Sequence, residues 1–70
     1  MKKTIEELLA REPFAAFRIV MNSGDRIDVD TSDMVVMGRD QLTYYYPNSN
    51  AVAFVRLTEI AFVRVENLLV

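Results

Sequence analysis

The 70-residue chain contains no cysteine, no histidine and no tryptophan. Without cysteine it has no disulfide framework, no thiolate nucleophile and no cysteine-ligated zinc site. Without histidine it lacks the most common general base and the usual zinc or haem ligand. No apolar run reaches the roughly 18 residues that a membrane-spanning helix needs. No signal-peptide apolar segment follows the basic residues Lys2 and Lys3, so we expect a cytoplasmic protein.

An excess of positive charge is missing as well. Eight Lys and Arg residues stand against ten Asp and Glu residues, which gives a formal net charge of −2. Proteins that bind nucleic acid usually carry a basic excess, because the neutralisation of phosphates supplies much of their affinity. The overall balance therefore argues against nucleic acid as a partner, although the six arginines leave a local cluster open.

Apolar residues, in contrast, are abundant and make up 51% of the chain. A chain of this length forms one domain, over residues 1–70. On its own such a domain buries only about 60% of the surface that its unfolded chain exposes. Small domains without disulfides or metals often gain stability by oligomerisation. We therefore expect a homo-oligomer.

The N-terminal segment predicts one short helix over residues 4–11. Thr4 and Glu7 have the spacing of a capping box, in which each side chain accepts a hydrogen bond from the other residue's backbone N–H. Pro13 disfavours a helical backbone at the residue before it, so the helix should end near Arg11. A helix this short is not stable alone and must dock on the rest of the domain.

From Phe14 onwards the hydrophobic period changes to two, which is typical of β-strands. The alternating segments 16–22 and 26–30 flank a turn signal at Gly24 and predict a hairpin. Apolar runs between further turn signals predict additional strands at residues 34–37, 42–46, 51–57 and 60–65. The short connections exclude crossover helices, so the strands should be antiparallel. The predicted fold is mainly β, a short N-terminal α-helix followed by a five- to six-stranded antiparallel small barrel.

The last two predicted strands carry apolar residues on both faces. Within residues 51–57, Val55 lies on one face, while Val52 and Phe54 lie on the other. A single small barrel has one inside, and a short helix covers only part of its outside. The remaining apolar side chains predict an interface with another copy or another protein.

The final strand shows the same division. Ile60 and Phe62 are expected on one face of residues 60–65, and Val63 is expected on the other. The interface candidates are the apolar residues that we expect to point outward: Val36, Val52, Phe54 and Phe62.

Three consecutive tyrosines stand directly before a turn. Aromatic side chains on a strand can stack on bases, but tyrosine is also a good strand former that suits half-buried and interface positions. Tyr44 and Tyr46 should share one face. The predicted ligand surface combines this pair with nearby arginines: Tyr44, Tyr46, Arg39 and Arg56.

Residues 25–33 contain four aspartates. Asp28 and Asp30 begin like a calcium-binding loop, but the sixth position is Asp33 where glycine is needed, and the twelfth is Arg39 where glutamate belongs. We interpret the stretch as a solvated strand face with an acidic turn. The sequence predicts no metal site and no cofactor.

Residue types suited to catalysis are scarce. The only lysines are at positions 2 and 3, and the three serines lie in predicted turns without a histidine base or a nucleophile elbow. No glycine-rich phosphate loop is present. A carboxylate pair such as Asp28 and Asp30 has no evident cleft that would separate its two pKa values. We predict that the protein is not an enzyme.

Four motifs are spread along the chain between residues 13 and 63: Pro13-Phe14-x-x-Phe17-Arg18-Ile19, Gly24-x-x-x-x-Val29, Met34-Val35-Val36-Met37-Gly38-Arg39 and Leu57-x-x-Ile60-x-x-Val63. Together they resemble a widespread family of very small bacterial proteins of unknown function. The chain departs from the family at residues 31–33, where the family has His-Pro-Glu, and at Glu59, where it often has His. The resemblance implies no activity.

A looser likeness links the chain to Sm-like barrels, which have an N-terminal helix and five bent strands. Gly24, Arg56 and Ile60 match positions in that pattern. Sm-like proteins form rings through their edge strands and often bind RNA. Because the likeness is topological, it implies a fold and a mode of assembly more than a ligand.

Three functions are compatible with these observations. The preferred one is a non-catalytic interaction or assembly module that self-associates through apolar strand faces or edges. The first alternative is an Sm-like RNA-binding ring, which requires several arginines on one face or pore. The second is a small regulator that docks on a single protein partner. No membrane association is predicted.

Overall fold

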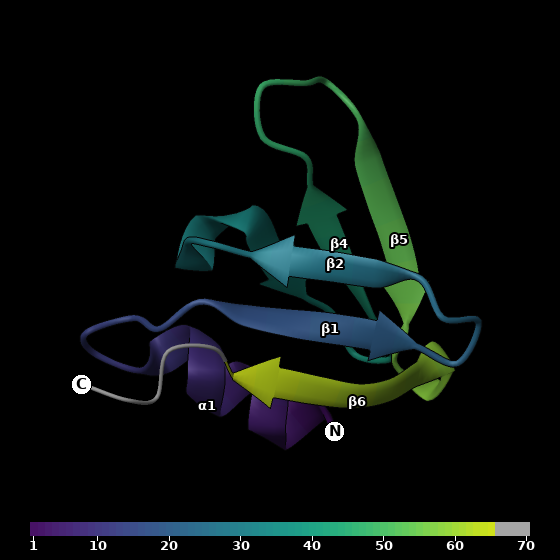
Figure 1. The fold of residues 1–70 in the computed structure, drawn as a ribbon, viewed down its shortest axis with the longest axis horizontal. Coiled ribbons are helices and arrows are strands. Elements are labelled where there is room, and N and C mark those ends of the chain that lie inside the picture. The colour runs from purple at the N-terminus through teal and green to yellow at the C-terminus, as the bar shows by residue number, and fades with distance from the viewer. Residues whose placement is uncertain (66–70) are drawn as a thin grey trace.

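The computed structural model describes residues 1–65, in which one α-helix precedes six strands (Figure 1). The elements are α1 (Lys2–Ala10), β1 (Phe17–Met21), β2 (Arg26–Val29), β3 (Val35–Met37), β4 (Gln41–Tyr45), β5 (Val52–Arg56) and β6 (Ile60–Val65). Short 3₁₀ turns, η1 (Ser32–Met34) and η2 (Leu57–Glu59), precede β3 and β6. The predicted mainly β class with one short N-terminal helix is confirmed.

Helix α1 begins earlier than the sequence pattern indicates. Its N-cap is Met1, no side chain caps it, and the Ile5 backbone N–H donates to the Met1 carbonyl at 3.1 Å. Thr4 therefore has a helical backbone, and the predicted capping box is wrong, because a capping residue must lie outside the helix. The C-terminal end agrees with the prediction, since Arg11 has an extended backbone.

The predicted hairpin of β1 and β2 is confirmed. Phe17 pairs with Val29 and Ile19 with Ile27 across the two strands. Gly24 in the connecting turn has a φ of +96°, a conformation that side chains with a Cβ rarely adopt. The alternation of apolar and polar residues thus specifies both the strands and their register.

The strands form two three-stranded antiparallel sheets, and the described residues contain no closed barrel. The first sheet has the order β2-β1-β6, so the last strand returns to the first. The second sheet has the order β3-β4-β5 and crosses the first steeply (Figure 1). The predicted small barrel is therefore present only as two separate sheets among residues 1–65: η1 separates β2 from β3, and β3 pairs with β4.

Turn η2 places the two C-terminal strands in different sheets. The Leu57 backbone N–H donates to the Asp40 carbonyl at 2.9 Å, next to the second sheet. The Asn22 backbone N–H donates to the Glu59 carbonyl at 2.7 Å, next to the first sheet. These bonds hold the chain as it leaves β5 and enters β6.

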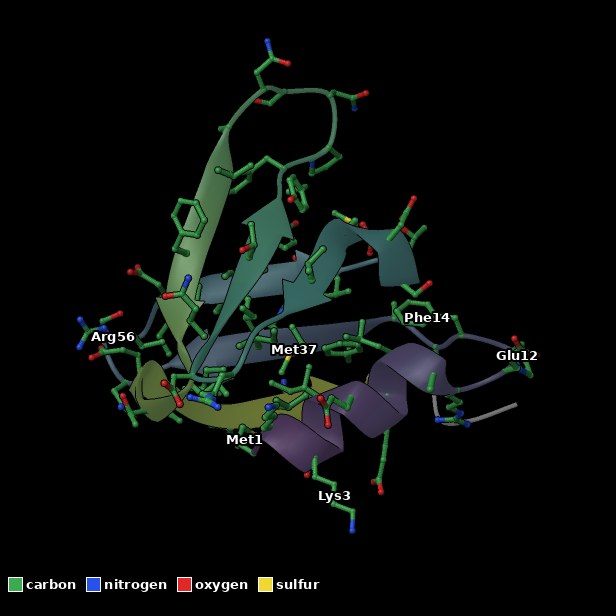
Figure 2. The ribbon with its side chains drawn as sticks, turned by 180° about the vertical axis from the view of Figure 1, so that it is seen from behind. Met1, Lys3, Glu12, Phe14, Met37 and Arg56 are labelled. Atoms are coloured by element: carbon green, nitrogen blue, oxygen red, sulfur yellow. The ribbon has the colours of Figure 1, made fainter. Side chains whose placement is uncertain are left out.

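The hydrophobic core lies between the two sheets and α1. Helix α1 contributes its one buried residue, Ile5, and lies along β6 (Figures 1 and 2). The buried apolar residues come from every element: Ile5, Phe17, Ile19, Ile27, Val29, Met34, Val35, Leu42, Tyr44, Val55 and Ile60. The residues that alternate with them point away from the core and form the outer faces of the sheets.

The face assignment predicted for β6 is wrong at its first residue. Ile60 is buried, whereas Phe62 is 49% exposed. The register against β1 shifts here, because Met21 pairs with Ile60 and Val20 with Phe62. Ala61 is the extra residue, and a bulge of this kind reverses which side chains share a face.

Candidate interaction surfaces

The outer face of the second sheet carries a cluster of exposed apolar side chains. Strand register places Val36 of β3, Thr43 of β4 and Phe54 of β5 in one row across the sheet. Tyr45 and Val52 form the next row. We call these five residues the apolar face.

Exposure within the apolar face is high for side chains of this type. Phe54 is 68% exposed and Val36 is 54% exposed. Tyr45 and Val52 are also exposed, and Thr43 is half-buried. These side chains stand on the side of the sheet away from the core, so they are available to a partner.

Charged residues occur only at the margin of this sheet face. Arg56 pairs with Gln41 in the row next to Phe54, and it points out of the molecule at the end of β5 (Figure 2). None of the five residues of the apolar face is charged. The face is therefore neutral at its centre, which favours an apolar contact over an ionic one.

The structure brings three of the four predicted interface residues together. Val36, Val52 and Phe54 belong to the apolar face. Phe62 lies instead on the outer face of the first sheet, beside Val20 of β1. The four residues therefore form two separate surfaces.

The residues of the predicted ligand surface do not lie on one face. Tyr44 shares the inner face of the second sheet with Leu42 and is only 5% exposed. Arg56 is on the outer face of the same sheet, and Arg39 is exposed in the turn between β3 and β4. Tyr46 is exposed after β4.

Tyr44 links the two sheets. Its hydroxyl donates to the Asp28 carbonyl of β2 at 2.8 Å, and its ring meets that of Tyr46 edge to face at a centroid distance of 4.9 Å. Burial raises the pKa of the Tyr44 hydroxyl above its ordinary value of 10.0, and the negative charge of Asp30 raises this pKa further. Tyr44 therefore has a structural role, because it connects the two sheets.

The four aspartate side chains of residues 25–33 do not form a cluster. Within residues 1–65, no group of three or more acidic side chains is placed to hold a metal ion. Ser23 donates to Asp25 and Thr31 donates to Asp33, each across two residues in an exposed turn. Such contacts are typical of turns.

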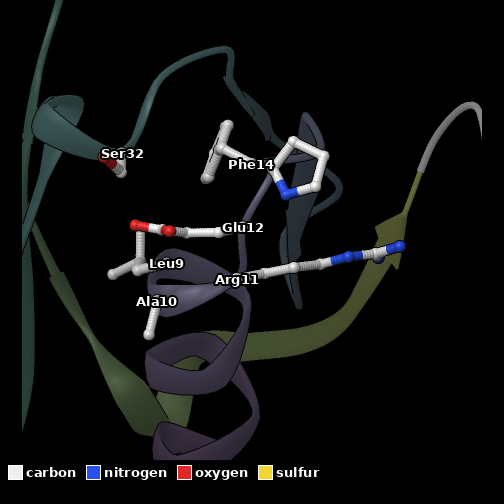
Figure 3. A pocket seen from close by; sticks show the side chains of 7 residues that line it. Leu9, Ala10, Arg11, Glu12, Phe14 and Ser32 are labelled. Carbon is white, nitrogen blue, oxygen red and sulfur yellow. The ribbon is translucent and has the colours of Figure 1, made fainter.

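One hollow, of about 660 Å³, lies where α1 meets the chain entering β1. It is open, and Figure 3 shows the Arg11 and Glu12 side chains pointing away from each other. The lining residues are Leu9, Ala10, Arg11, Glu12, Pro13, Phe14 and Ser32. Two smaller hollows, of about 460 and 390 Å³, are both lined by Arg56. The charged groups of the first hollow, Arg11 and Glu12, therefore do not converge on a common point.

A repeated tetrapeptide in the sequence marks both of these surfaces. The tetrapeptide Ala-Phe-Val-Arg occurs at residues 53–56 and again at residues 61–64. Each copy lies on an edge strand and exposes its phenylalanine and arginine while its valine faces inward. The two copies have different neighbours, which the sequence pattern alone does not indicate.

Comparison with known proteins found no protein family, no curated protein and no solved structure that matches the chain. The resemblances to the small bacterial family and to Sm-like proteins therefore stay predictions. Across the part of the chain that the structure describes, no helix is long and apolar enough to cross a membrane.

Proposed function

We propose that the protein is a non-catalytic assembly module whose apolar face binds the same face of a second copy. The observation that carries this proposal is the row Val36–Thr43–Phe54, in which the largest side chain is 68% exposed.

The size of the apolar face supports a second copy as its partner. Its four large side chains expose on the order of 400 Å², the scale of the largest apolar patches on monomers. Two copies packed face to face would bury about 800 Å² from these side chains, and a polar rim brings the contact to the roughly 1,000 Å² of a specific interface. A contact at this lower end of the size range is typical of weak complexes, so we expect a dissociation constant in the micromolar range.

The charge of the apolar face also suits a second copy. A two-fold contact places each residue against a patch of the same composition, so a charged centre would repel itself. The five residues of the apolar face carry no charge, and the single arginine at its margin, Arg56, is exposed to solvent screening. A regulator that docks on one other protein would use this same face. Measuring the mass of the protein in solution distinguishes this alternative from the dimer.

We propose further that the strand order is Sm-like. Support comes from β1, which pairs with both β2 and β6, and from the helix that precedes it. The turn η2 between β5 and β6 is consistent with the closing strand pair of that pattern. This proposal concerns the order of strands, and the dimer does not depend on it.

Light scattering after size exclusion tests the dimer. The wild-type protein, run from about 1 to 200 µM to bracket micromolar affinity, should approach twice the monomer mass of 8.0 kDa. Phe54→Asp should remain a monomer over the whole range, because it places a charge at the centre of the contact. A wild-type monomer at every concentration would contradict the proposal and leave docking on another protein as the use of this face.

The matched control is Phe62→Asp. It introduces the same charge at the same place in the second Ala-Phe-Val-Arg copy, on the other sheet. This variant should dimerise like the wild type. If both variants dissociate equally, the apolar face is not the contact. Circular dichroism of each variant confirms that the fold is intact, as expected for exposed positions.

A further inference from the structure

The outer face of the first sheet combines arginines with one exposed aromatic ring. Strand register places Arg18 between Asp28 and Arg64 in one row, and Val20 between Arg26 and Phe62 in the next. We call these six residues the basic face. They carry a formal charge of +2, in a chain whose net charge is −2.

Two of the three arginines are available for an outside ligand. Arg18 is partly satisfied, since its Nε lies 2.6 Å from the Asp28 Oδ1. Arg26 and Arg64 are exposed and form no ion pair within residues 1–65. Among the described residues, unpaired positive charge therefore remains on both strands that flank β1, at Arg26 of β2 and at Arg64 of β6.

Phe62 gives this face a second property besides charge. Its ring is 49% exposed and lies between Val20 on the neighbouring strand and Arg64, two residues along its own strand. Residues two apart on a strand are separated by about 7 Å, and neighbouring strands by about 4.8 Å. If a flat ring stacks on Phe62, the Arg64 guanidinium is therefore close enough to contact a group that is attached to that ring.

Aromatic rings and arginines on an open sheet are the elements that recognise single-stranded nucleic acid. Unpaired bases stack on aromatic side chains and on guanidinium planes, while cations neutralise the phosphates. A duplex keeps its bases stacked inside and cannot use Phe62 in this way. An acidic peptide can use the arginines but has no flat base for the ring.

We propose that the basic face binds single-stranded nucleic acid, with Phe62 stacking on a base and Arg26 and Arg64 contacting phosphates. The site lies on the first sheet and shares no residue with the apolar face, so it does not rest on self-association. It also differs from a ring with a central pore, because one copy of the chain supplies every group named.

Fluorescence anisotropy with labelled oligouridine and oligothymidine of about 12 nucleotides, a typical single-strand site size, tests the proposal. Binding should weaken from 50 to 200 mM salt, roughly as expected for a few phosphate contacts. Arg26→Ala/Arg64→Ala should lower the affinity about tenfold and reduce the salt slope by about 1.4, the value for two phosphates on a single strand. Phe62→Leu should lower the affinity about fivefold at either salt concentration, through lost stacking.

Two matched variants separate this site from general charge attraction. Arg56→Ala removes an exposed arginine from the other Ala-Phe-Val-Arg copy and should leave the affinity unchanged. Phe62→Tyr keeps an aromatic ring and should bind like the wild type. The proposal is overturned if no oligonucleotide binds at 50 mM salt, if Arg56→Ala weakens binding as much as Arg64→Ala, or if polyglutamate of equal charge binds as tightly as the oligonucleotides.

Discussion

Tyr44 shows how one residue can have two plausible roles in a sequence. A tyrosine among tyrosines, close to arginines, is typical of a ligand surface, yet the Tyr44 side chain is 5% exposed and its hydroxyl donates to the Asp28 carbonyl. The ring fills the space between two sheets, and the hydroxyl satisfies a backbone group of the opposite sheet. Tyr44 therefore contributes to stability, and ligand binding is expected from other residues.

Replacing Tyr44 with phenylalanine should remove this link without removing the ring. We expect Tyr44→Phe to lower the free energy of unfolding by about 1 kcal/mol at pH 7, the net value of a hydrogen bond. Urea denaturation measures this change. Tyr46→Phe is the control, because Tyr46 is exposed and the described residues give its hydroxyl no hydrogen bond.

Tyr44 should also make the free energy of unfolding depend on pH. Because folding raises the pKa of Tyr44 above 10.0, the folded state holds this proton more tightly than the unfolded state. The contribution of Tyr44 is complete below pH 10 and is lost as the pH rises above it. The stability difference between wild type and Tyr44→Phe should therefore shrink as the pH rises above 10 in urea titrations, and a difference that stays constant there would contradict the assignment.

Gly24 is a second residue with a specific conformational role. A Cβ at this position would have nothing within 4 Å, so only the φ of +96° opposes a side chain. We expect Gly24→Ala to destabilise the protein by about 1 kcal/mol through backbone strain. Thermal denaturation would show this, and an unchanged melting temperature would mean that the turn relaxes.

At the scale of elements, α1 is stabilised by docking. A nine-residue helix is marginal in isolation, and the N-terminal end of α1 has no side-chain cap. Ile5 is fully buried among core residues of both sheets, and Leu8 and Leu9 pack against that core. Packing of these apolar residues, rather than a side-chain cap, therefore stabilises the helix.

Two substitutions in α1 distinguish docking from capping. Ile5→Ala should destabilise the protein by about 2 to 4 kcal/mol, because it leaves a cavity in the core. Thr4→Ala should leave the stability within about 0.5 kcal/mol of the wild type, since Thr4 is exposed inside the helix. Chemical denaturation compares them. A loss of about 1 kcal/mol in Thr4→Ala would restore the capping box.

Most strands could be predicted from the sequence, while their assembly could not. Strict alternation in β2 and the turn at Gly24 determine the hairpin locally, so its register follows from pattern and turn chemistry. The bulge at Ala61 and the break at η1 depend on contacts between distant segments, such as the bond from Asn22 to Glu59. Those contacts decide that two sheets form and that Phe62 and Phe54 lie on different surfaces.

At the scale of the whole molecule, the chain has more apolar surface than one core of this size encloses. Among residues 1–65, the eleven buried core residues lie on one face of each sheet, while Phe54 and Val36 remain on the outside. A second apolar layer against another copy would bury them and add stability that a small domain otherwise lacks. We therefore expect the protein to self-associate through the apolar face.

Sedimentation equilibrium of the unmodified protein measures this self-association. We expect a weight-average mass that rises with concentration from 8.0 kDa towards twice that value, with a micromolar dissociation constant. A mass that stays at 8.0 kDa up to the highest concentration would contradict it.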